Sequence, residues 1–189
     1  MKKRFIILFF IVMIIIPQMG CKSQNNNVGI EKTSFHLDTI CKITVYSMEG
    51  LEGMSEEEQK KEVLSVITDA FKLCDEYENI LSKTKEGTDI YRINHAGGEA
   101  VEVSEAAIEV IRKGIEYGQL SGGAFDITIG AVTDMWDFHN TDEEGNRIGE
   151  VPDEAALKEA SSHVDYRNII INGNTVRLAD PGAQIDLGG

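Results

Sequence analysis

The spacing of apolar residues early in the chain predicts a strand. Within residues 35–47, Cys41, Ile43 and Val45 alternate with side chains that carry a polar group. This two-residue period is that of a strand with one buried face. Glycines follow the run and end it.

A long helix is predicted next. Ser55 and Glu58 have the spacing of a capping box, in which the serine hydroxyl accepts from one amide and the glutamate reaches back to another. The helix should continue to about Ser82. Its apolar positions recur at helical spacing and indicate packing into a core rather than a cofactor contact: Val63, Ile67, Ala70, Phe71, Cys74, Tyr77 and Leu81.

Further strands and helices are predicted along the rest of the chain, after a polar, turn-rich stretch at 83–98. They are a strand at 100–103, a helix capped by Ser104, a glycine-rich turn at 121–126, a helix at 152–162, strands at 167–171 and 175–178 joined by the hairpin turn 172–174, and a strand at 183–187. This order predicts an α+β fold in which a mixed or antiparallel sheet packs with helices.

The N-terminus has the pattern of an export signal. Three basic residues at 2–4 precede twelve uncharged apolar residues at 5–16, fewer than the roughly 20 that span a bilayer. A glycine directly before Cys21 resembles a lipoprotein signal, in which the cysteine is lipidated; a plain secretory signal is the alternative. We expect a signal peptide at 1–20, a lipidated tether at 21–33, and a lipid anchor on the extracytoplasmic face of the cell membrane.

Composition and charge narrow the class of partner. The 189 residues are 42% hydrophobic and 26% charged, which is enough apolar material for a sizeable core. The net charge of −14 argues against nucleic-acid binding, whereas backbone amides or a metal could still hold a small phosphorylated ligand. Cys41 and Cys74 are expected to be thiols, although export would permit a disulfide, and four scattered histidines form no zinc pattern.

Two glycine-containing segments carry candidate chemistry. Residues 122–126, Gly-Gly-Ala-Phe-Asp, place a ring and a carboxylate beside backbone amides that could grip a flat ring and a phosphate. A glycine turn with a buried Phe and a capping Asp is the alternative. At 185–189, Ile-Asp-Leu-Gly-Gly, Asp186 could hold a hydroxyl or ring N–H where glycines admit a ligand, or the segment could be a simple turn.

A family resemblance connects these segments. Residues 123–130, Gly-Ala-Phe-Asp-Ile-Thr-Ile-Gly, followed by Trp136, resemble the GAFDxTxG…W signature of the FAD:protein FMN transferases, the ApbE family. Four further stretches resemble family segments in the same order: Phe-His-Leu-Asp-Thr at 35–39, the LS…N loop at 81–94, the strand at 101–104, and the DLGG segment at 185–189.

The resemblance implies a fold and a reaction. Residues 34–189 would be the N-terminal portion of a flavin transferase domain, an incomplete ApbE-like (T-fold-like) domain. Such enzymes bind FAD and Mg²⁺, transfer the FMN half to a threonine or serine hydroxyl of a target protein, and release AMP; the metal neutralises charge on the leaving group. The implied partner is a flavoprotein subunit of a membrane redox complex or an extracellular reductase.

The resemblance also implies site residues, although it assigns no catalytic residue. They are FAD contacts at Leu37, Thr84, Ala124, Phe125, Asp126 and Asp186, and a main-chain oxygen of Gly189 as a metal ligand. Leu37 stands where the family often has Met, and Thr84 where many members have an aromatic residue.

The family's lysine motif, a later histidine and its metal-binding Asp and Thr or Ser would lie beyond Gly189. We therefore expect the 189-residue chain to show little transferase activity by itself, because phosphoryl transfer without metal carboxylates loses most of its electrostatic stabilisation. The alternatives are a lipoprotein that binds FAD or hydrolyses it to FMN and AMP, and a scaffold with an inactive site.

Overall fold

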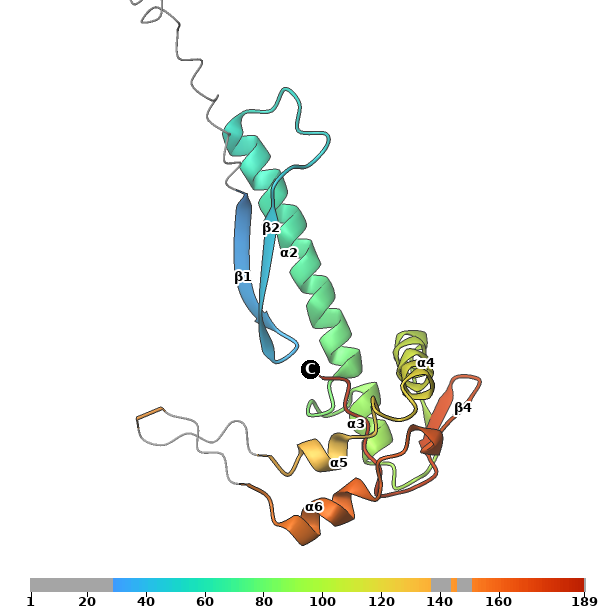
Figure 1. Cartoon of the computed structure of the whole chain (residues 1–189). Helices are drawn as coiled ribbons and strands as arrows, with labels where there is room; N and C mark the ends of the chain where they lie inside the picture. The colour runs from blue at the N-terminus through green and yellow to red at the C-terminus, as the bar shows by residue number, and fades with distance from the viewer. Residues whose placement is uncertain (1–28, 137–143, 146–150, 189) are drawn as a thin grey trace, which may run out of the picture.

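The structure combines an N-terminal hairpin, a long helix and a small sheet with shorter helices (Figure 1). It is a computed structural model that describes residues 29–136, 144–145 and 151–188. In chain order the elements are β1 (Ile30–His36), β2 (Thr39–Val45), α2 (Glu56–Leu81), α3 (Asp89–Asn94), β3 (Val101–Glu102), α4 (Glu105–Leu120), α5 (Gly130–Thr133), α6 (Glu154–Ser161), the 3₁₀ helix η1 (Tyr166–Asn168), β4 (Ile169–Asn172) and β5 (Thr175–Leu178). The α+β class predicted from the sequence is confirmed.

The prediction of one strand at 35–47 is wrong, because the chain forms the antiparallel hairpin β1–β2 there. It reverses at Leu37 and Asp38, whose φ angles are 52° and 55°. This turn contains neither Gly nor Pro, and Asp38 is its single turn-forming residue, so the turn signal in the sequence is weak. Residues 30–33, expected to end the tether, lie in β1, where most side chains are exposed and give no apolar alternation. The folded part therefore begins before residue 34.

The predicted capping box and the long helix that follows it are confirmed. Glu58 N–H donates to the hydroxyl of Ser55 at 3.4 Å, and Ser55 N–H donates to the Glu58 carboxylate at 2.9 Å. Three members of the predicted apolar stripe are buried and form a small core against the hairpin: Val63, Ile67 and Phe71. Tyr77 is 42% exposed, so the stripe weakens toward the end of the helix.

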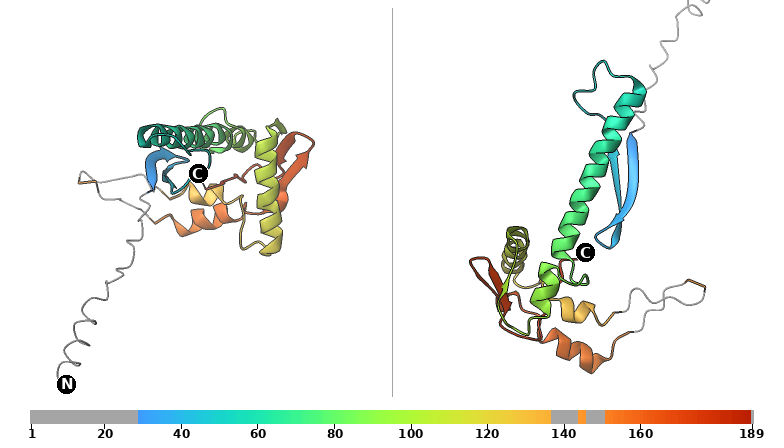
Figure 2. Two further views of the ribbon diagram at one scale, coloured as in Figure 1. Left: turned by 90° about the horizontal axis from the view of Figure 1, so that it is seen from above. Right: turned by 180° about the vertical axis from the view of Figure 1, so that it is seen from behind.

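A larger core lies where α3, α4 and a three-stranded sheet gather at the C-terminal end of α2 (Figure 2). The sheet has the strand order β3-β5-β4, and both pairings are antiparallel. The hairpin turn predicted at 172–174 is confirmed, with Gly173 at a φ of 60°. Helix α3 occupies the stretch at 83–98 in which the sequence predicted only turns; Thr88 caps it by accepting from Tyr91 N–H at 3.2 Å.

The strand predicted at 183–187 is not one. Among the described residues this segment makes a single parallel bridge, between Ile129 and Gln184. Its apolar residues are nevertheless buried, because Ala183 and Ile185 are both 0% exposed in the larger core. The apolar pattern therefore predicted the burial of this segment correctly, but burial alone does not make a strand, which also needs a neighbouring strand to pair with.

Several predictions concern residues outside the described ones: the signal peptide at 1–20, Cys21, most of the tether and Gly189. In the described part of the chain, no helix has the length and apolar character needed to cross a membrane. Cys41 and Cys74 are free, half-buried thiols, as expected.

Candidate functional site

A cavity of about 650 Å³ opens beside α4. Its volume lies within the range of small-molecule sites, about 300–1,000 Å³. Most of the residues that line it are apolar or glycine, and three are charged: Lys113, Asp126 and Asp186. The other lining residues are Val110, Gly114, Tyr117, Gly123, Ala124, Phe125, Ile127, Ile129, Thr133, Val164, Leu187 and Gly188. The cavity thus joins both glycine-containing segments that the sequence marked as candidate chemistry.

Four of the six FAD contacts implied by the resemblance line this cavity: Ala124, Phe125, Asp126 and Asp186. The other two described residues do not belong to its lining. Leu37 lies in the β1–β2 turn, where its N–H donates to the carboxylate of Glu78 at 2.8 Å. Thr84 is exposed in the loop after α2, with its hydroxyl 3.2 Å from that of Ser82.

The glycine-rich turn after α4 is built from residues with left-handed backbone. Gly122 and Gly123 have φ angles of 65° and 88°, which L side chains rarely adopt. Gly123 N–H donates to the carbonyl of Gly118 at 2.9 Å, and Ser121 accepts from Phe125 N–H at 3.0 Å. The turn therefore ends the helix and delivers Phe125 to the cavity edge.

Phe125 is presented to solvent rather than packed into the core. Its side chain is 49% exposed, and its ring lies edge-on to that of Tyr117 with centroids 6.2 Å apart. The alternative of a glycine turn with a buried Phe is therefore wrong. A half-exposed ring at a cavity edge is available to pack against a flat ligand.

The carboxylate of Asp126 binds the protein's own backbone. Its Oδ1 accepts from the N–H and the hydroxyl of Thr128 at 2.8 and 2.7 Å, and its Oδ2 accepts from Tyr166 N–H at 2.8 Å. The Thr128 hydroxyl in turn accepts from Asp165 N–H at 2.8 Å. Asp126 thus links the cavity segment to the start of η1, and a direct ligand contact by its carboxylate stays a prediction.

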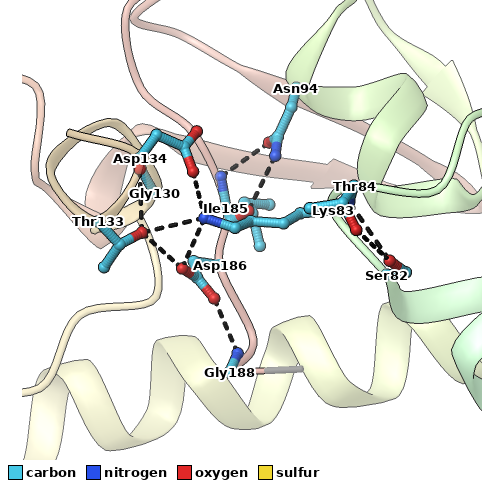
Figure 3. Close-up of polar contacts among 10 residues, drawn as sticks. All are labelled: Ser82, Lys83, Thr84, Asn94, Gly130, Thr133, Asp134, Ile185, Asp186 and Gly188. Atoms are coloured by element: carbon cyan, nitrogen blue, oxygen red, sulfur yellow. Dashed lines mark hydrogen bonds and ion pairs between the residues drawn. The ribbon is translucent and has the colours of Figure 1, made fainter. Parts of the chain in front are cut away.

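Asp186, which also lines the cavity, lies at the centre of a polar cluster (Figure 3). Its Oδ2 accepts from the hydroxyl of Thr133 at 2.6 Å and forms an ion pair with Lys83 Nζ at 2.9 Å; its Oδ1 accepts from Gly188 N–H at 2.9 Å. Burial acts to raise the pKa of Asp186, but these hydrogen bonds and the charge of Lys83 outweigh burial and hold the pKa below its usual value. Asp186 is therefore an anion at neutral pH.

The backbone around Asp186 is fixed by partners distant in sequence. Asp186 N–H donates to the carbonyl of Ile127 at 2.8 Å, and Gly130 N–H donates to that of Gln184 at 2.9 Å. The side-chain amide of Asn94 exchanges two hydrogen bonds with the backbone of Ile185, at 2.8 and 2.7 Å. Because the backbone of Gln184, Ile185 and Asp186 is hydrogen-bonded to distant residues, the position of the Asp186 carboxylate is fixed.

Sequence reasoning missed Lys83, Thr133 and Asp134 as members of this cluster. Lys83 Nζ contacts Asp134 Oδ1 at 2.5 Å and the Thr133 hydroxyl at 3.0 Å. No local pattern marks them, because the lysine follows α2 whereas its partners are 50 residues or more away along the chain. Only the fold brings the loop and α5 together.

A metal site is not complete within the described residues, where no group of three or more His, Cys, Asp or Glu side chains could hold an ion. The Asp186 carboxylate is already paired with an ammonium. The residues present therefore do not by themselves fit Mg²⁺.

Comparison with known proteins gives a consistent result. Residues 37–189 match the profile of the ApbE family. The chain is 28% identical over 160 residues to a protein named FAD:protein FMN transferase from Treponema pallidum, covering 80% of this chain and 40% of that protein. A protein of the same name from Vibrio cholerae is 26% identical over 121 residues, covering 64% of this chain and 35% of its own length.

Solved structures agree on the fold. The ApbE protein of Thermotoga maritima superposes with a TM-score of 0.65 at 27% identity, covering 84% of this chain and 47% of that one. The flavin transferase ApbE of Vibrio cholerae gives a TM-score of 0.65 at 21% identity, over 84% of this chain and 48% of its own. The chain therefore spans less than half the length of each of these four proteins.

Proposed function

This chain belongs to the ApbE family, and on that premise we propose that it is part of an FAD:protein FMN transferase. In the proposed reaction a threonine or serine hydroxyl oxygen of a target protein attacks the phosphorus of the FMN half of FAD. The bond from that phosphorus to the bridging oxygen breaks, AMP leaves with the electron pair, and the hydroxyl proton is released. The relatives named above support flavin transfer in general, whereas the acceptor hydroxyl and AMP release are parts of the proposal.

The observation that carries this proposal is the cavity. Two segments about 60 residues apart in sequence line the same cavity of about 650 Å³. One contributes Ala124 and Phe125, and the other contributes Asp186. A half-exposed aromatic ring, glycine backbone without side chains and one anchored anion are the groups that hold a flat, polar-edged molecule. These are also the residues at which the resemblance implies contact with FAD.

Each residue would contribute differently to binding. Phe125 offers a ring face, and Gly123 and Ala124 allow close approach to the backbone. Asp186 would accept a hydrogen bond from a ligand hydroxyl or ring N–H, because it is ionised and only 13% exposed. Asp126 would act indirectly, because its three hydrogen bonds with Thr128 and Tyr166 hold the cavity segment against the start of η1.

Mg²⁺ belongs to the proposal on the strength of the resemblance alone. Bound at the site, it would neutralise charge on the phosphates. Its proposed main-chain ligand, Gly189, lies outside the described residues.

The proposed location rests on the N-terminal sequence, and the proposed partner on the family resemblance together with that location. Lipidation of Cys21 would anchor the protein on the extracytoplasmic face of the cell membrane. A target there would be a flavoprotein subunit of a membrane redox complex or an extracellular reductase. Palmitate labelling of the wild-type chain and Cys21→Ala in the native host tests this part separately.

FAD binding by this chain is the first test. Quenching of FAD fluorescence should give saturable binding, and Phe125→Ala should weaken it about fivefold through loss of ring packing. Phe35→Ala is the matched control, since Phe35 is 64% exposed on β1 and does not line the cavity. Absence of binding, or equal losses in both variants, would contradict the proposal.

The products then separate transfer from its alternatives. The chain is incubated with FAD, Mg²⁺ and a threonine-containing acceptor peptide, and peptide mass and nucleotides are measured. Flavin on the peptide together with AMP supports transfer. Free FMN with AMP would indicate a pyrophosphatase instead, and bound but unchanged FAD a binding protein. We expect transfer by this chain to be weak.

A further inference from the structure

Lys83 stands in a loop whose backbone is held rigidly. Ser82, which caps α2, accepts from the N–H groups of Thr84 and Lys85 at 3.3 and 3.2 Å. The hydroxyl of Thr88 donates to the carbonyl of Ser82 at 2.5 Å, and Ser82 and Thr88 are 6% and 3% exposed. The backbone from which the Lys83 side chain extends is therefore fixed, and the side chain itself is only 19% exposed.

All three donors of the Lys83 ammonium have a partner within the protein. An ammonium has three N–H bonds and no acceptor. Nζ lies 2.5 Å from Asp134 Oδ1, 2.9 Å from Asp186 Oδ2 and 3.0 Å from Thr133 Oγ1 (Figure 3). A fully engaged ammonium is a cross-link between segments rather than a vacant anion site.

We infer that Lys83 is a positioning residue for the cavity: it holds the carboxylate of Asp186 in one orientation at the cavity edge. It does so by joining the loop after α2 to α5 and to the segment at 185–188. The identity of the ligand in this inference rests on the proposed function.

The charges explain why one lysine matters here. Asp134 and Asp186 share a single cation, so removing it leaves two neighbouring carboxylates without compensation. Asp134 is 50% exposed and can turn toward water, whereas Asp186 is 13% exposed and cannot. Its carboxylate would rotate or take up a proton, and either change alters what the cavity presents to a ligand.

The cavity residues themselves do not replace the lysine. Thr133 supplies one hydrogen bond to Asp186 Oδ2 and Gly188 supplies one to Oδ1, and both donors are neutral. Lys113, the cationic side chain in the lining of the cavity, pairs with Glu116 at 2.7 Å on α4. Among the described residues, the positive charge beside Asp186 comes from Lys83.

The test compares Lys83→Met, which keeps the aliphatic stem, with Lys83→Arg, which keeps the charge. Lys85→Met is the matched control, because Lys85 is exposed in the same loop and donates to Asn79 instead. The Asp186 carboxyl is followed by ¹³C NMR titration without ligand, and FAD binding is measured by fluorescence. A purely structural effect would move the melting temperature but not the Asp186 titration.

In Lys83→Met we expect the Asp186 titration to move upward by about one pH unit and FAD to bind about tenfold more weakly. Lys83→Arg should restore most of both effects, and Lys85→Met should change neither. An unchanged Asp186 titration in Lys83→Met would overturn the inference, as would FAD binding that is equally weak in the methionine and arginine variants. If Lys83→Met does not fold, the arginine and control variants still decide. The inference is supported if the Asp186 titration moves as little in Lys83→Arg as in Lys85→Met. It is overturned if Lys83→Arg loses FAD binding completely.

Failure of the proposed function would look different. Wild-type protein that binds no FAD would overturn the proposed ligand, while the ligand-free titration still tests whether Lys83 controls Asp186. The two hypotheses therefore fail in separate measurements.

Discussion

The side chain of Asn94 and the backbone of Ile185, 91 residues apart in sequence, exchange two hydrogen bonds of 2.8 and 2.7 Å. The asparagine thereby replaces the neighbouring strand that the segment at 183–187 lacks. Because Ile185 is 0% exposed, its backbone groups have no access to water and depend on this one side chain. Asn94 at the end of α3 therefore fixes the segment that carries Asp186.

Asn94→Ala should lower the free energy of unfolding by about 2 kcal/mol, since it leaves buried backbone groups of Ile185 without a partner. Urea denaturation followed by circular dichroism measures this. Asn79→Ala, an exposed asparagine of α2, should change the free energy by less than about 0.5 kcal/mol. Equal losses in the two variants would show that the Ile185 contact is not what stabilises the segment.

Asp126→Asn should lower the free energy of unfolding by about 1–3 kcal/mol, because an amide has one oxygen where two are needed and its NH₂ would face an N–H donor. Chemical denaturation is compared with Asp69→Asn, a change on the exposed face of α2. A variant that keeps wild-type stability but loses FAD binding would mean that Asp126 acts on the ligand and not on the link between the cavity segment and η1.

Gly130→Ala should be destabilising by about 1–3 kcal/mol. A Cβ at position 130 would lie 2.6 Å from the backbone oxygen of Gln184, which cannot move without displacing the segment that bears Asp186. Gly118→Ala should destabilise the fold less. Its Cβ would meet the side-chain ring of Tyr166 and not backbone, and alanine has a higher helix propensity than glycine, which offsets part of the loss. The order of the two thermal midpoints checks this, and the reverse order would contradict it.

Stability should fall in acid partly through Asp89. Burial acts to raise the pKa of Asp89, but hydrogen bonds from Ser104 and Arg92 and the charge of Arg92 outweigh it and lower the pKa. A lowered folded-state pKa contributes stability above the unfolded value of about 3.9, and that stability is lost as pH falls through the folded pKa. Unfolding free energies at several pH values between 7 and 3 should therefore decline less steeply in Asp89→Asn. An identical slope would exclude this role.

A weaker trend should appear at higher pH through His163. A hydrogen bond to Asp180 at 2.8 Å raises the pKa of His163 above its usual value. Its contribution is complete below the unfolded pKa of about 6.5 and disappears as pH rises through the folded value. We expect His163→Gln to remove this dependence between pH 6 and 8 in thermal melts. No difference between the two pH profiles would indicate that the pair is fully screened by water.

Much of the local structure was predictable from the sequence because short-range chemistry determines it. The capping box at Ser55 starts α2, Ser104 caps α4, and the hairpin turn at 172–174 joins β4 and β5. Each signal lies within a few residues of the element it specifies. The reversal at Leu37 and Asp38 was missed because Asp38, which tolerates left-handed backbone, is a weak signal by itself, and Leu37 is not a turn-forming residue type.

By itself the sequence determined the α+β class, the main helices, the family and the two segments that line the cavity. Tertiary structure alone decided that Phe125 is exposed, that Asp126 binds the backbone amide of Tyr166, and that Lys83 pairs with Asp186. The physical reason is distance along the chain. Patterning and capping act over a few residues, whereas Asp126 meets Tyr166, and Lys83 meets Asp186, only when segments about 40 to 100 residues apart pack together.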